Sequence, residues 1–161
     1  MIKRPTFYIV SAMALLVLGY FGLGSSERRQ AASFAGRFSQ MLEARATDGL
    51  RQLVVSPSFL ADKAPAERDH LMIDLLAGEV SAEGMNILVK EGVFGPLSSV
   101  FPTEQARWCK AFDVRSEDCV AFKLVRDNLT AELVLHRESD GSYRVLRAND
   151  IRQLAASPPV P

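Results

Sequence analysis

The pattern of hydrophobic and polar positions opens with one long apolar run. Residues Phe7–Leu23 carry no charge and follow the cationic pair Lys3-Arg4. A helix that spans a bilayer needs about 17 to 25 apolar residues, whereas the core of a cleaved secretory signal has about 7 to 15. The length therefore predicts a transmembrane anchor over residues 7–24, after a short cytoplasmic tail over residues 1–6. The small residues at Gly22–Ser26 leave a cleaved signal as the alternative.

The orientation of this anchor follows from the chain on its two sides. Lys3 and Arg4 precede the run and Arg28 and Arg29 follow it, so the positive charges are only slightly asymmetric. A very short tail precedes the run, however, and more than a hundred residues follow it. We expect a single-pass protein with a cytoplasmic N-terminus and an extracytoplasmic C-terminal domain, which would be periplasmic in a bacterium.

After the run, apolar residues recur every three or four positions, the period of a helix with one buried face. This stripe predicts a helix from about Glu27 that packs on a later sheet. Pro65 suits the first turn of another helix, and Ser81 and Thr103 could cap two more. Phe94–Leu97, which contains Gly and Pro, is predicted to be a turn. The stripe consists of Ala31, Phe34, Ala35, Phe38, Met41 and Leu42.

The last third of the chain alternates between apolar and polar residues, as strands do. Three such stretches, 119–126, 129–137 and 143–147, are separated by the turn signals Asp127-Asn128 and Asp140-Gly141. A tight first turn places Lys123 opposite Glu132 and Phe122 opposite Leu133. The sequence thus predicts an α+β domain over residues 25–156: several helices packed on an antiparallel meander of at least three strands. A proline-rich, disordered tail is expected at 157–161.

Composition and motifs exclude several classes of function. Nineteen basic and nineteen acidic residues leave no net charge to attract nucleic acid. His70 and His136 each lack a second ligand at a metal-binding spacing, and no nucleotide-binding or hydrolase motif is present. We therefore expect no metal, no cofactor and no catalytic residues, and we expect that the protein is not an enzyme.

Cys109 and Cys119 are the two cysteines of the chain. Outside the cytoplasm, a lone pair is often oxidised to a disulfide, which would join the predicted Trp108 helix to the first strand of the meander. The alternative is that both are small buried hydrophobic residues. The pair does not form a CxxC motif, so thiol-oxidoreductase chemistry is not expected.

The ends of the domain resemble the nuclear transport factor 2-like superfamily, also called SnoaL-like or cystatin-like α+β. The stretch 34–59 (FAGRFSQMLEA…DGLRQLVVSPSF) is similar to that family's opening helix and following short helix, and 142–149 (SYRVLRAN) is similar to its closing strand. Residues 71–101 depart from the family, which usually begins its sheet there. The resemblance implies a cone-shaped pocket, and enzymes of the superfamily place His and Asp or Glu inside it, but no such set is carried over.

Two functions remain. The first is a non-enzymatic envelope protein, held in the membrane by Phe7–Leu23, whose domain binds a protein partner or supports an assembly. Its binding surface would be the outward face of the meander: Lys123, Thr130, Glu132 and Arg144. The alternative is a small-ligand pocket between sheet and helix, with weak lyase or isomerase activity, lined by Phe34, Phe38, Trp108, Phe122, Leu133 and Tyr143.

Overall fold

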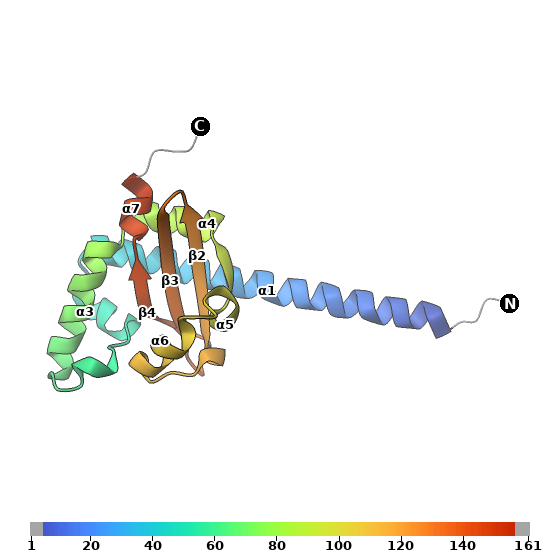
Figure 1. The fold of residues 1–161 in the computed structure, drawn as a ribbon, viewed down its shortest axis with the longest axis horizontal. Helices are drawn as coiled ribbons and strands as arrows, with labels where there is room; N and C mark the ends of the chain where they lie inside the picture. Colours follow the sequence, from blue (N-terminus) through green and yellow to red (C-terminus); the bar gives the residue numbers. More distant parts are fainter. Residues whose placement is uncertain (1–4, 157–161) are drawn as a thin grey trace.

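The computed structural model describes the backbone of residues 5–156 and the side chains of residues 24–156. Helix α1 (Pro5–Glu43) is one continuous helix, of which the second half packs in the domain while the first half projects away from it (Figure 1). The other helices are short segments around the sheet. They are α2 (Thr47–Leu50), η1 (Arg51–Leu53), η2 (Ser58–Leu60), α3 (Pro65–Glu79), α4 (Ala82–Glu91), α5 (Leu97–Val100), α6 (Gln105–Phe112), η3 (Ser116–Asp118) and α7 (Ile151–Ala156).

The expected anchor is not tested by this structure. Among the residues whose side chains the structure describes, no helix is both long and apolar enough to cross a membrane. Phe7–Leu23 lies outside those residues, as does the tail predicted at 157–161. The anchor, its orientation and the disordered tail therefore stay predictions.

The sheet has four antiparallel strands within the described residues, in the order β1-β2-β3-β4. They are β1 (Val93–Pro96), β2 (Cys119–Arg126), β3 (Leu129–Arg137) and β4 (Tyr143–Asn149). The predicted register is confirmed, since Lys123 pairs with Glu132 and Phe122 with Leu133. The β3–β4 pairing shifts at a bulge between Val134 and Leu135. The α+β architecture with a C-terminal meander is therefore confirmed.

Two local predictions are wrong. Phe94–Leu97, expected to be a turn, instead supplies the last three residues of β1 and the first of α5. The backbone of β1 pairs with β2 from Val93–Lys123 to Pro96–Val120. Pro tolerates this position because β1 is an edge strand, where one side of the backbone needs no partner. Thr103 does not cap α6, which begins at Gln105 without a side-chain hydrogen bond at its N-cap.

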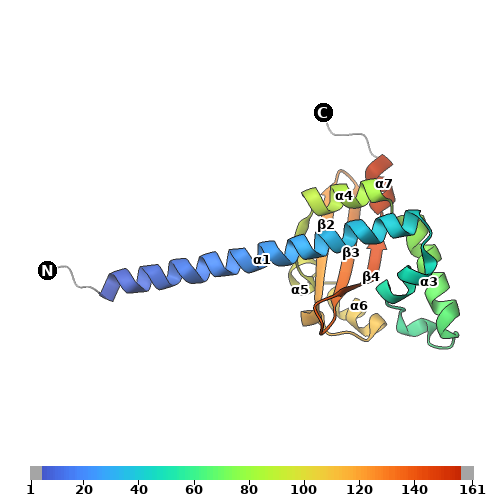
Figure 2. The ribbon, with the colours of Figure 1, turned by 180° about the vertical axis from the view of Figure 1, so that it is seen from behind.

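Helices cover both faces of the sheet (Figures 1 and 2). On one face, α1, α3, α4 and α7 bury the larger core, which includes Phe38, Leu88 and Phe122. On the other face, α5 and α6 bury a smaller core around Phe101 and Trp108, whose ring centroids are 4.9 Å apart. The meander therefore has no broad solvent-facing side within the described residues.

Helix α1 supplies side chains to both ends of α4. The Nη2 atom of Arg28 donates hydrogen bonds to the carbonyl oxygens of Val89 and Gly92, both at 3.0 Å, where α4 ends. At the other end, Glu43 accepts a hydrogen bond from the Ala82 backbone N–H at 2.8 Å. A cation at a helix C-terminus and an anion at its N-terminus both interact favourably with the helix dipole. These contacts fix α4 antiparallel to α1.

Helices α4 and α7 approach each other closely at Gly84. A Cβ atom added there would lie 1.9 Å from the backbone carbonyl oxygen of Ile151. Real Cβ atoms do not come so close to a carbonyl oxygen, so only glycine fits at this position. This close approach of α7 to α4 allows Ile151 and Leu154 of α7 to be fully buried in the larger core.

Candidate functional site: two grooves along strand β4

Strand β4 is the edge of the sheet opposite β1, and the segment 51–59 crosses it. Val54 forms a parallel bridge with Val145, and the backbone N–H of Val55 donates to the Val145 carbonyl oxygen at 2.9 Å. The guanidinium of Arg144 also donates to the Val54 carbonyl oxygen. The crossing protects the middle of an otherwise open edge strand. It also separates two grooves, one at each end of β4.

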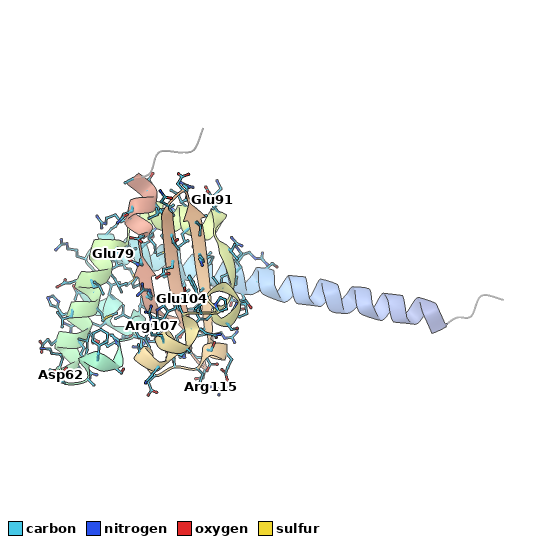
Figure 3. All side chains as sticks on the ribbon, viewed as in Figure 1. Asp62, Glu79, Glu91, Glu104, Arg107 and Arg115 are labelled. Carbon is cyan, nitrogen blue, oxygen red and sulfur yellow. The ribbon has the colours of Figure 1, made fainter. Side chains whose placement is uncertain are left out.

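The first groove, which we call the apolar groove, lies between α3, α6 and the second half of β4. Its volume is about 370 Å³, at the lower end of the range of about 300 to 1,000 Å³ that small-molecule pockets occupy. Glu79 of α3 and Arg107 of α6 line it from two elements (Figure 3). Its other lining residues are Pro57, Phe59, Met72, Leu75, Leu76, Trp108, Ala111, Phe112, Leu146, Arg147, Ala148 and Asn149.

Large apolar side chains are exposed at this groove. Phe59 is 75% exposed and Leu75 is 60% exposed, and both line it. Leu71, one turn before Leu75 on α3, is also exposed. Single exposed apolar residues are ordinary on a protein surface, but neighbouring ones at a groove mark an interaction site.

Trp108, which lines the apolar groove, carries an unpaired hydrogen-bond donor. Its indole Nε1 is buried and has no hydrogen-bond partner among the described residues. The guanidinium carbon of Arg147 lies 5.1 Å from the centroid of the Trp108 ring, and the same guanidinium pairs with Glu132. A buried donor without a partner loses its hydration without compensation.

The second groove, which we call the basic groove, lies at the other end of β4, between α1 and the turn that joins β3 to β4. Its volume is about 990 Å³. Three arginines, Arg29, Arg37 and Arg144, line it together with one carboxylate, Asp140. The remaining lining residues are Ser26, Gln30, Ser33, Phe34, Phe38, Met41, Gln52, Leu53, Gly141, Ser142 and Tyr143.

The structure does not bring the six predicted pocket residues into one cavity. Phe34, Phe38 and Tyr143 line the basic groove, and Trp108 lines the apolar groove. Phe122 and Leu133 are fully buried in the larger core and line neither groove. The space between sheet and helix, where the cavity was expected, is filled by these side chains.

The predicted outward face of the meander is also largely covered. Thr130 is exposed, but Lys123 and Arg144 are half-buried and Glu132 is only 8% exposed. The prediction that Glu132 is exposed is wrong, because Arg147 pairs with it on the face that α6 covers. The ammonium of Lys123 lies 4.8 Å from the centroid of the Phe101 ring, so it makes a cation–π contact with a residue of the smaller core.

Cys109 and Cys119 are free thiols in this structure, so the disulfide stays a prediction. Burial raises the pKa of the Cys119 thiol to about 12 and, more weakly, the pKa of the Cys109 thiol. Cys119 pairs across the strands with His136, whose Nδ1 lies 3.1 Å from a carboxylate oxygen of Glu138. This order of Cys, His and Glu resembles a nucleophilic triad, but a thiol with so high a pKa is not activated.

The sequence pointed to Phe34, Phe38, Trp108 and Tyr143 as pocket residues, but not to two separate grooves. It did not single out Phe59, Leu75, Arg37 or Arg107 as part of a site. The groove residues come from segments far apart in the chain, so periodicity does not reveal them. Leu71 and Leu75 gave a partial signal, because with Met72 and Leu76 they make the apolar stripe of α3 wider than one buried face requires.

Within the described residues, no group of three or more His, Cys, Asp or Glu side chains could hold a metal ion. A comparison of the chain with protein-family models, curated proteins and solved structures returned no match. The resemblance of the two ends of the domain to the nuclear transport factor 2-like superfamily therefore stays a prediction.

Proposed function

We propose that this chain is a non-enzymatic, membrane-anchored protein whose extracytoplasmic α+β domain binds a partner protein in the apolar groove. The observation that carries the proposal is the exposure of Phe59 and Leu75 at the apolar groove. Binding energy in protein interfaces is concentrated in a few apolar and aromatic anchors that enter such grooves. Phe59 and Leu75 would frame the entry of one such anchor.

A charged side chain of the groove indicates the chemistry of the partner segment. Arg107 is exposed at the rim and pairs with no carboxylate among the described residues. A carboxylate on the partner would complement it. The proposed occupant is therefore an apolar segment with an adjacent acidic residue.

The alternative of a lyase or isomerase with an enclosed pocket has less support. Such a pocket needs space between the sheet and α1, but Phe38, Phe122 and Leu133 are fully buried there. Cys119 is the cross-strand neighbour of His136, and burial raises the pKa of its thiol to about 12, so no activated nucleophile lies beside the His136–Glu138 pair. Partner binding needs neither feature.

The groove can be tested by site-specific photo-crosslinking in cells with the full-length protein. A benzophenone amino acid replaces Phe59 in one variant and Val125 in another, because Val125 is as exposed as Leu75 but lies outside both grooves. We expect an adduct with a second protein from position 59 and not from position 125. Arg107→Glu, added to the position-59 variant, should reduce that adduct several-fold, because it places a like charge opposite the partner's carboxylate.

Three results would contradict the proposed groove. One is the same adduct from positions 59 and 125, and another is an adduct that Arg107→Glu leaves unchanged. The third is an adduct at twice the mass of the chain itself, which would identify a second copy as the occupant.

The membrane part of the proposal has its own test, with the protein tagged at its C-terminus. We expect the protein to stay in the membrane fraction after a carbonate wash and its domain to be digested by protease added outside the cytoplasmic membrane. Cys109 and Cys119 should react with a maleimide in denaturant only after reduction, because an oxidising compartment favours their disulfide. A soluble product shortened by the length of the apolar run, with both thiols reactive, would contradict the anchor and the disulfide.

A further inference from the structure

The lining of the basic groove has more positive than negative charge. Three guanidinium groups face one carboxylate in its lining. That carboxylate, on Asp140, accepts hydrogen bonds from the hydroxyl and the backbone N–H of Ser142, at 2.6 and 2.8 Å, and they lower its pKa. Asp140 is thus held in its own turn, and no ion pair joins it to an arginine among the described residues.

The three arginines are engaged to different degrees. Arg37 is exposed and has neither a hydrogen bond nor an ion pair within the described residues. Arg29 donates through Nε to the Ser25 carbonyl oxygen at 3.3 Å, a long hydrogen bond that leaves its terminal nitrogens available. Arg144 is held by the Val54 carbonyl oxygen and lies 3.7 Å from Glu138, while its buried Nε has no partner. Arg37 is therefore the group most available to an anion.

The floor of the basic groove is apolar. Phe34 stacks on Phe38 with ring centroids 6.1 Å apart, and Tyr143 lies 5.8 Å from Phe34. Met41 and Leu53 are half-buried at the side of this aromatic cluster. Met41 and Leu53 leave apolar surface that a ligand with an apolar body can cover, whereas a small inorganic ion cannot.

We propose that the basic groove binds an amphipathic organic anion. The aromatic or acyl body of the ligand lies on the floor of Phe34, Met41 and Leu53. Its carboxylate, sulfonate or phosphate group pairs with the guanidinium of Arg37 and with Arg144. Arginine suits this role because its planar group donates two parallel hydrogen bonds to such anions. The site is separate from the apolar groove and does not depend on the partner proposed there.

The probe is 1-naphthalenesulfonate, a bicyclic apolar body with one anionic group, titrated by calorimetry into the full-length protein in phosphatidylcholine nanodiscs. Empty nanodiscs give the background heat. Two comparison ligands separate the contributions: 1-naphthalenemethanol keeps the ring system without the charge, and inorganic phosphate keeps a charge without the ring. We expect saturable binding of the sulfonate and at least about tenfold weaker binding of both comparison ligands.

Arg37→Gln is the decisive variant because its side chain is exposed and makes no contact that the fold needs. It should weaken sulfonate binding by about tenfold, the loss of one charge-assisted contact. Arg107→Gln, which removes a guanidinium from the apolar groove, is the matched control and should leave the affinity unchanged. Equal effects of the two variants, equal binding of the neutral alcohol or of phosphate, or no saturable heat with the sulfonate would overturn the proposal.

Discussion

Replacing Gly84 by alanine is expected to lower the free energy of unfolding by about 3 kcal/mol. The added methyl group would meet the Ile151 carbonyl oxygen at 1.9 Å, and this atom belongs to the backbone of α7 and cannot rotate away. Helices α4 and α7 would have to separate, which opens the larger core where Ile151 and Leu154 are buried. Urea unfolding of the full-length protein, followed by the fluorescence of its one tryptophan, Trp108, measures the change.

Gly36 provides the matched control. It lies within α1, and a Cβ atom added there meets nothing within 4 Å. Gly36→Ala should therefore stabilise the domain by about 0.5 to 1 kcal/mol, because alanine loses less backbone entropy in a helix. If both glycines respond alike, the close approach of α4 and α7 is not what restricts position 84.

Phe122→Ala is expected to cost about 3 to 5 kcal/mol, the usual range for removing a buried aromatic ring. Phe122 is fully buried, its ring centroid lies 4.7 Å from that of Phe94, and the Arg28 guanidinium lies above it. Phe122→Leu should cost only about 1 to 2 kcal/mol, because leucine fills much of the same space. The same unfolding measurement applies to both variants.

This prediction also separates the two functions considered for the chain. A phenylalanine that lines an open ligand pocket leaves no new cavity when it is truncated, and its loss should affect stability little. A core phenylalanine leaves a cavity and costs several kcal/mol. A loss of less than about 1 kcal/mol on Phe122→Ala would therefore contradict the filled core between sheet and helix and would restore the enclosed pocket.

The hairpin of β2 and β3 could be predicted residue by residue because its information is local, whereas the bulge in the β3–β4 pairing was not predicted. Strands β2 and β3 alternate clearly, and the two-residue turn Asp127-Asn128 leaves one register, which the structure confirms. Strand β1 could not be predicted in this way. It has four residues, Gly and Pro among them, and it becomes a strand because it pairs with β2 far along the chain.

The alternation of apolar and polar residues also did not predict that α5 and α6 cover the sheet face opposite the larger core. Lys123 and Glu132 have the charge expected of a solvent-facing pair, and they do pair across the strands. Neither side chain is fully in water, because Lys123 contacts the Phe101 ring and Glu132 pairs with Arg147 on the face that α5 and α6 cover. Alternation of apolar and polar residues distinguishes the two faces of a strand, but it does not show whether helices cover the polar face.

The length of the continuous helix α1 determines how far from the membrane a partner must extend to contact the apolar groove. If residues 7–24 span a bilayer, the part of α1 from Gly24 to Glu43 extends about 28 Å beyond it at 1.5 Å per residue. Helix α3 lies at that distal end (Figure 1), and it carries Leu71 and Leu75. Because this part of α1 packs within the domain, the domain itself lies next to the lipid headgroups and the apolar groove lies on its distal side. A partner confined to the bilayer could not touch it, whereas a protein with a domain of comparable height could.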